Sequence, residues 1–110
     1  MSKMTHLECS KCCTHHDADI VQTVCSKCGK PLFPRYDLEA AKEIITKREL
    51  VGRVASMWRY REILPVRRAE NVVTLGEGWT PLTPTPKLGE SLGLKNLLVK
   101  DEGRNPTASF

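Results

Sequence analysis

The sequence has 110 residues, of which 40% are hydrophobic and 27% are charged, so its composition is that of one globular domain and not of a disordered chain. Its 17 basic and 13 acidic residues leave a formal charge of only +4, and the two signs alternate, which argues against a nucleic-acid-binding surface. No apolar run approaches the ~18 residues of a membrane-spanning helix, and the N-terminus lacks the apolar segment of a signal peptide. We therefore expect a cytoplasmic protein with no membrane partner.

Two identical CSKC motifs, twelve residues apart, account for four of the five cysteines, all of which lie in the first 28 residues. Thiolates at i and i+3 of a tight turn can point at one ion, and two such turns complete the tetrahedral sulfur site of structural Zn²⁺. Residues 18–24 and 31–36 are expected to form the strands of a short β-hairpin that closes this site. Residues 1–36 are thus predicted to be a zinc-ribbon-like knuckle, with a metal-free thiol cluster as the alternative. The expected metal ligands are Cys9, Cys12, Cys25 and Cys28.

Three further residues near these motifs could compete as ligands. The four thiolates already fill a tetrahedron, so Cys13, His15 and His16 are expected to be exposed turn residues. Cys13 stands where the second motif is followed by Gly29, so the first turn lacks a residue that tolerates positive φ at no cost.

A helical connector is predicted over residues 37–70. Asp37 is placed to cap a helix that ends near Gly52, and residues 56–64 form a second short helical segment before a proline. In the run WRYR at 58–61, the aromatic rings are expected to pack while the arginines extend to solvent. A nucleic-acid contact by this run is the less favoured alternative.

The last segment, residues 71–110, has the pattern of an α/β domain. Strands are expected at 71–75 and 96–100, with a short helix at 87–92 that ends at Gly93. Because about 40 residues cannot cover both faces of such a sheet, we expect the chain to be the N-terminal piece of a larger protein.

The final nine residues, EGRNPTASF, resemble the segment that leads to the Schiff-base lysine in the pyridoxal-phosphate (PLP) enzymes of the tryptophan-synthase-β fold group. The CSKC pairs, the MWRYRE stretch and the LGEGWTPL loop resemble the threonine synthase family in that order, over residues 7–110. This resemblance implies an α/β protein in which the zinc-ribbon-like knuckle precedes the start of a three-layer, PLP-dependent α/β domain.

The resemblance also implies an activity for the complete protein. It would convert O-phospho-L-homoserine and water to L-threonine and phosphate, the last step of threonine biosynthesis, with PLP as cofactor and structural Zn²⁺ in the knuckle. The catalytic lysine is expected directly after Phe110, so the 110-residue chain itself should be inactive. Thr107 and Ser109 could equally cap the following helix, and Glu77 and Thr80 are weaker candidates for substrate contact. The residues expected at the cofactor are Asn105, Thr107, Ser109 and Phe110.

Other functions compete with this hypothesis. A different PLP-dependent enzyme of the same fold group, such as cysteate synthase or threonine dehydratase, shares part of the pattern. A stand-alone zinc-ribbon module that binds nucleic acid or protein would need a basic stripe, which the sequence does not show. The oligomeric state is left open, with a homodimer as the arrangement to test for the complete enzyme.

Overall fold

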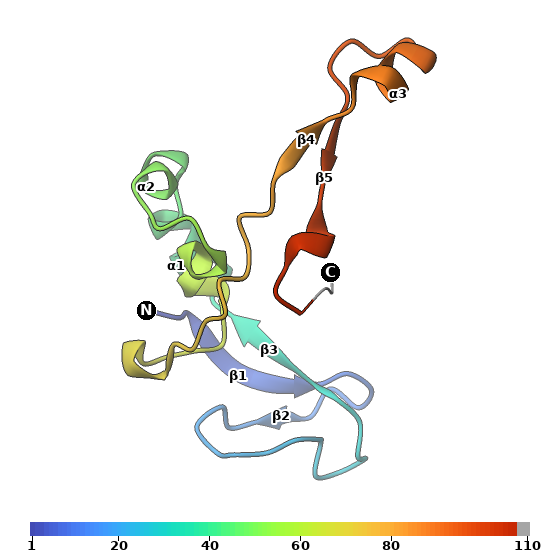
Figure 1. Cartoon of the computed structure of the whole chain (residues 1–110). Coiled ribbons are helices and arrows are strands. Elements are labelled where there is room, and N and C mark those ends of the chain that lie inside the picture. Colours follow the sequence, from blue (N-terminus) through green and yellow to red (C-terminus); the bar gives the residue numbers. More distant parts are fainter. Residues whose placement is uncertain (108–110) are drawn as a thin grey trace. The chain divides into compact units, whose positions relative to one another are not determined.

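The computed structural model describes residues 1–107, which divide into two compact units (Figure 1). The first unit comprises Met1–Val54 and Trp58–Val72, and the second comprises Ala55–Met57 and the chain from Val73 onward. Among the described residues, no helix has both the length and the apolar character needed to cross a bilayer.

The first unit is built on a three-stranded antiparallel sheet with the order β2–β1–β3 (Figure 1). Strand β1 spans Met4–Cys9, β2 spans His15–His16 and β3 spans Leu32–Tyr36. The strand expected at residues 31–36 is thus confirmed, while the central strand, β1, was not anticipated. The pairing brings the end of β1, which carries the first CSKC motif, beside the start of β3, which follows the second.

The strand predicted at residues 18–24 is wrong, because this segment forms turns and bends. The Asp17 carboxylate accepts a 2.8 Å hydrogen bond from the Asp19 amide, and the Gln22 side chain donates to the Asp17 carbonyl over 2.6 Å. Such local side-chain bonds offer the backbone an alternative to a β-ladder. Val21 is 99% exposed, so this β-branched side chain is not packed against a sheet.

Two short helices follow in place of the single helix expected before Gly52. Helix α1 spans Leu38–Ile44, and the Asp37 carboxylate caps it by accepting a 2.9 Å bond from a first-turn amide, as predicted. Helix α2 spans Lys47–Val51, ends at Gly52, and is capped in the same way by Thr46 over 3.2 Å. The Thr46 hydroxyl begins a second helix within a continuous helical pattern, which explains the break.

The segment η1, Met57–Ile63, is a kinked 3-10 helix in which Trp58 is half-buried and Arg61 is exposed, as expected, whereas Arg59 and Tyr60 reverse the expected arrangement. Arg59 is only 8% exposed and Glu62 only 1%, whereas Tyr60 is 42% exposed. The Glu62 carboxylate accepts two hydrogen bonds from the Arg53 guanidinium, at 2.7 and 3.0 Å. The Arg59 guanidinium donates to the Leu50 carbonyl, and the planar fork of Arg53 meets the Glu62 carboxylate, so hydrogen bonds within the unit replace those to solvent for both arginines.

The second unit contains a two-stranded antiparallel ribbon, β4 (Leu82–Pro84) with β5 (Leu98–Lys100), joined through helix α3 (Pro86–Ser91). The helix expected at 87–92 is therefore confirmed one residue earlier in the chain, and the strand expected at 96–100 is confirmed over its last three residues. Gly93 follows α3 with φ of 69°, the left-handed conformation that glycine adopts freely.

Two expectations for this segment are wrong. Residues 71–75 form no strand, since the 3-10 turn η2 (Ala69–Asn71) is followed by irregular chain. Strand β4 instead pairs with β5, so the described residues hold an antiparallel ribbon and not the open α/β sheet that was expected. The 3-10 turn η3, Glu102–Arg104, then leads into the last loop.

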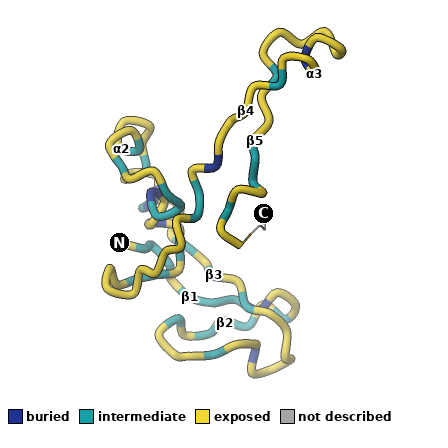
Figure 2. The backbone as a smooth tube through the Cα atoms, in the orientation of Figure 1, coloured by how far each residue is buried: buried dark blue, intermediate teal, exposed yellow. Residues whose placement is uncertain are grey.

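Few residues are buried in either unit (Figure 2). In the first unit, the buried residues include Cys9, Cys25, Ala41 and Glu62. In the second, Leu82, Leu92 and Leu98 are 59%, 60% and 48% exposed. The first unit therefore packs around thiols and an ion pair, while the ribbon of the second exposes its apolar side chains.

Candidate functional site

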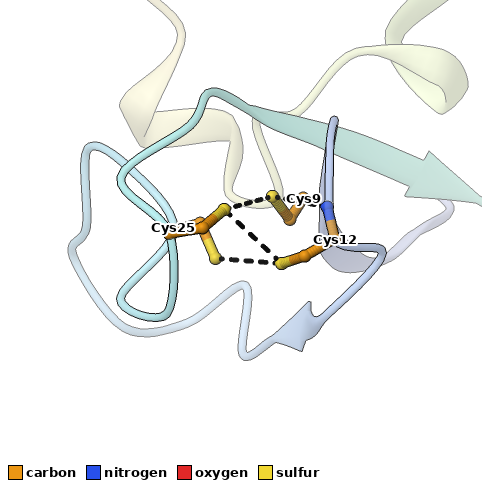
Figure 3. Close-up of side chains that lie close together, drawn as sticks. Cys9, Cys12 and Cys25 are labelled. Atoms are coloured by element: carbon orange, nitrogen blue, oxygen red, sulfur yellow. Dashed lines mark hydrogen bonds between the residues drawn. The ribbon is translucent and has the colours of Figure 1, made fainter.

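The structure brings the four predicted metal ligands together, with their sulfur atoms within 4.8 Å of one another (Figure 3). The Cys9–Cys28, Cys12–Cys25 and Cys12–Cys28 sulfur pairs are 3.4, 3.6 and 3.5 Å apart. A tetrahedral ion with Zn–S bonds of ~2.3 Å places its sulfurs about 3.8 Å apart, whereas a disulfide would need ~2.05 Å. The spacing fits a four-thiolate metal site.

Each CSKC motif forms the same turn. In the first, the Lys11 and Cys12 amides point at the Cys9 sulfur over 3.4 Å each, and the Cys13 amide donates to the Cys9 carbonyl. In the second, the Gly29 amide donates over 2.8 Å to the carbonyl of the first cysteine of its pair. Cys13 and Gly29 both have positive φ, 56° and 69°. The first turn thus adopts the left-handed conformation without a glycine.

The thiols of the cluster differ strongly in pKa. The Thr14 hydroxyl, 3.1 Å from the Cys12 sulfur, lowers the pKa of Cys12 to about 6, and the Cys12 amide lowers the pKa of Cys9. At Cys28 the Lys30 amide lowers the pKa, but the Cys9 thiol and burial outweigh it and raise that pKa to about 12. Four thiolates cannot gather without a compensating charge, which is what a divalent ion supplies.

The histidines beside the cluster do not behave as the sequence suggested. His15 and His16 form strand β2, so the expectation that both lie in an exposed turn is wrong. His16 is half-buried and its Nε2 lies 3.3 Å from the Cys25 sulfur, while His15 is exposed. Cys13 is exposed as expected. Because alternate residues of a strand face opposite sides, only His16 can support the thiol cluster.

A pocket in the second unit contains two of the four residues expected at the cofactor. Asn105 and Thr107 line a cavity of about 270 Å³. Ser109 and Phe110 lie outside the described residues. The walls also include Leu75, Glu77 and Gly78 from the LGEGWTPL loop. Met57, whose amide donates a hydrogen bond to the Glu77 carbonyl, completes them.

Asn105 ties the last loop to the GEGWTPL loop. Its Oδ1 accepts a 3.0 Å bond from the Gly78 amide, and its Nδ2 donates to Glu102 over 3.3 Å. The other carboxylate oxygen of Glu102 accepts from the Thr80 hydroxyl over 2.9 Å, and the Lys100 ammonium donates to the Thr80 carbonyl over 2.5 Å. Glu102 was not singled out from the sequence, although its place three residues before Asn105 in a turn-rich loop was a usable signal.

The GEGWTPL loop is shaped by its own backbone. Gly78 has φ of 83°, and a Cβ there would collide with the backbone of Met57, whose amide donates to the Glu77 carbonyl over 2.9 Å. The Glu77 carboxylate accepts 2.7 Å bonds from the Thr74 hydroxyl and the Leu75 amide. Bonds from its own amide and from Thr74 lower the pKa of Glu77. This carboxylate is therefore an ionised acceptor that holds the turn.

Comparison with known proteins gives one consistent result. No protein-family model and no solved structure matches the chain. The threonine synthases of Methanocaldococcus jannaschii and Methanosarcina acetivorans are each 42% identical to it, over 93% and 97% of its length. The threonine synthase of Halalkalibacterium halodurans is 48% identical over 50% of the chain. The chain spans about 25% of the length of the two archaeal relatives. It is therefore a homologue of the threonine synthases, related to them over a quarter of their length.

Proposed function

We propose that the chain forms the N-terminal quarter of a PLP-dependent threonine synthase, which converts O-phospho-L-homoserine and water to L-threonine and phosphate. The observation that carries this proposal is the 42% identity to two archaeal threonine synthases over nearly the whole chain. When bound, PLP supplies an electron sink that allows phosphate to be eliminated and water to be added. The contribution of this chain would then be to help bind the cofactor and the substrate, to orient them and to enclose them.

The pocket beside Asn105 supports that role. A cavity of about 270 Å³ lies at the small end of the range for ligand sites, so it fits one wall of a cofactor pocket and not a complete site. Both polar side-chain atoms of Asn105 are hydrogen-bonded, one to Gly78 and the other to Glu102. We therefore assign Asn105 to positioning the last loop against the GEGWTPL loop. The exposed Thr107 hydroxyl is left to face an anionic ligand. Ser109, Phe110 and the lysine expected next remain predictions from the resemblance.

The knuckle is proposed to hold one structural Zn²⁺. Four thiolates would occupy every position of a tetrahedral ion, so no position would remain for water or substrate. The ion would therefore hold the first unit together and take no part in the reaction. This proposal needs no nucleic-acid or membrane partner.

The proposal is tested on the protein extended through its native reading frame. The purified protein should bind PLP and release phosphate from O-phospho-L-homoserine while forming L-threonine. Asn105→Ala should lower kcat with little loss of fold, and Asn71→Ala, at an exposed asparagine of η2, is the matched control.

Two outcomes would contradict different parts of the proposal. Faster turnover of O-phospho-L-serine or of L-threonine would refute the substrate while leaving the enzyme class intact. Failure of the extended protein to bind PLP would refute the class itself.

A further inference from the structure

A second group of metal-ligating side chains lies on the three-stranded sheet, apart from the cysteines. His6 and Glu8 are two residues apart on β1 and so share one face, and His15 on β2 is paired directly with Glu8. One ligand atom from each of the three lies within 4.8 Å of the other two. Cys9 and His16 belong to the opposite face, so this group is distinct from the thiol site.

The hydrogen bonds of His6 prepare one nitrogen as a ligand. The Thr5 hydroxyl donates its only proton to the Arg35 carbonyl over 3.1 Å, and it lies 2.9 Å from Nδ1 of His6. In the tautomer whose Nδ1 donates to Thr5, Nε2 carries a free lone pair. Nε2 is buried and has no hydrogen-bond partner. A histidine whose second nitrogen donates to a neighbour is the usual arrangement of a metal ligand.

Glu8 and His15 complete the group. Arg35 holds one carboxylate oxygen of Glu8 at 2.5 Å, and the other oxygen lies 3.5 Å from Nε2 of His15. The rings of His6 and His15 have their centroids 4.1 Å apart.

The nature of the donors narrows the choice of metal. Arg35 offsets the single negative charge of Glu8, so hard cations that depend on several carboxylates, such as Mg²⁺ and Ca²⁺, find little attraction. Two neutral imidazoles and one carboxylate suit Zn²⁺, Co²⁺ and Ni²⁺. Three protein ligands would also leave positions for water.

We propose that His6, Glu8 and His15 form a second metal site, which takes a borderline divalent transition ion through two imidazoles and one carboxylate. The site is independent of the thiol cluster and of the proposed enzymatic reaction. A metal there would join β1 to β2 on the face opposite the cysteines.

The test uses the 110-residue chain with one equivalent of Zn²⁺ already bound and adds Zn²⁺ or Co²⁺ alone. Calorimetry should show one further equivalent. Because the chain has only three histidines, nitrogen-15 spectra can follow each ring separately. Further Zn²⁺ should shift ring nitrogens of His6 and His15 and leave those of His16 unchanged.

Variants make the assignment residue by residue. Glu8→Gln and His15→Gln should each weaken the affinity for the second equivalent of Zn²⁺ by at least about tenfold. Tenfold is the lower end of the loss in metal affinity that follows when only a residue hydrogen-bonded to a metal ligand is changed. Thr5→Val, which removes the hydroxyl that orients His6, should weaken it by about tenfold. Glu39→Gln, at an exposed carboxylate of α1, is the matched control and should have no effect.

Retention of the first Zn²⁺ shows that each variant is folded. The absence of a second equivalent in the unmodified chain would overturn the proposal. So would a second equivalent that moves the signals of His16, or that binds equally well to Glu8→Gln and His15→Gln.

Discussion

The two units of the chain both bury few apolar side chains, and they are held together in different ways. The first unit buries Cys9 and Cys25 beside two further thiols and pairs the buried Glu62 with Arg53. The second unit, over the described residues, relies on a polar web around Glu102 and leaves Leu82 and Leu98 largely exposed. The first unit thus gathers a set of four metal-ligating thiols where an apolar core would lie, whereas the described residues of the second unit hold no comparable cluster.

The largest expected effect comes from removing one metal ligand of the first unit. Cys25→Ser should abolish binding of Zn²⁺ at the thiol site and unfold the first unit, because structural zinc contributes roughly 10–16 kcal/mol of apparent binding energy in small metal-folded peptides. Metal analysis and amide spectra would report both results, and signals of β4 and β5 should persist. Cys13→Ser is the control and should keep one Zn²⁺. Retention of the ion at the thiol site by Cys25→Ser would contradict the assignment.

The buried ion pair gives the next largest effect. Glu62→Ala should cost about 3–5 kcal/mol in free energy of unfolding, because it leaves the Arg53 guanidinium, only 12% exposed, without its carboxylate. Denaturant titration of the zinc-loaded chain measures this loss. Glu43→Ala, at an exposed carboxylate of α1, should change stability by less than about 0.5 kcal/mol. If Glu62→Ala were equally mild, the pair would be incidental to the first unit.

The same carboxylate predicts a dependence on pH. Burial is the largest single influence and raises the pKa of Glu62, but the Arg53 hydrogen bonds, a bond from its own backbone amide and the charges of Arg53 and Arg61 together leave that pKa below its usual value. A carboxylate with a lowered folded-state pKa contributes stability above its unfolded value of about 4.3, and this contribution is lost as the pH falls through the folded pKa. The stability difference between the unmodified chain and Glu62→Gln should therefore be constant near neutral pH and shrink below about pH 4. A difference that grew on acidification would contradict the sign of the shift.

A smaller effect is expected from the two turns of the thiol site. Cys13→Gly should stabilise the zinc-loaded chain by about 1 kcal/mol, because glycine adopts the φ of 56° without strain. Gly29→Ala should lose a similar amount, since open space surrounds its Cβ position and the backbone strain alone remains. Thermal unfolding measures both changes. A loss of stability in Cys13→Gly, or a gain in Gly29→Ala, would show that neighbouring atoms, and not φ, set the difference between the turns.

The parts of the structure that the sequence predicted are those with a local cause. Repeated CSKC spacing indicated the ligand set, and Asp37, Gly52 and Gly93 marked helix ends through capping chemistry. These features depend on residues a few positions apart, so no tertiary knowledge was needed.

The parts that the sequence missed depend on partners far along the chain. Strand β1 was overlooked because its His and Glu residues lack β propensity, and it forms through pairing with β3. The β-branched run at 18–24 was mistaken for a strand because the turn set by Asp17 was not weighed. Burial of Arg59 depends on the Leu50 carbonyl and burial of Glu62 depends on Arg53, and no periodicity reveals either partner.

X-ray absorption at the zinc edge, on the chain carrying one equivalent of Zn²⁺, tests the thiol site most directly. The spectrum should show four sulfur neighbours at ~2.3 Å and no nitrogen or oxygen bound to the zinc. His16 provides the sharpest contrast, because its Nε2 lies only 3.3 Å from the Cys25 sulfur and could replace a thiolate. A shell of three sulfurs and one nitrogen at ~2.0 Å would contradict the assignment of Cys9, Cys12, Cys25 and Cys28 as the complete ligand set.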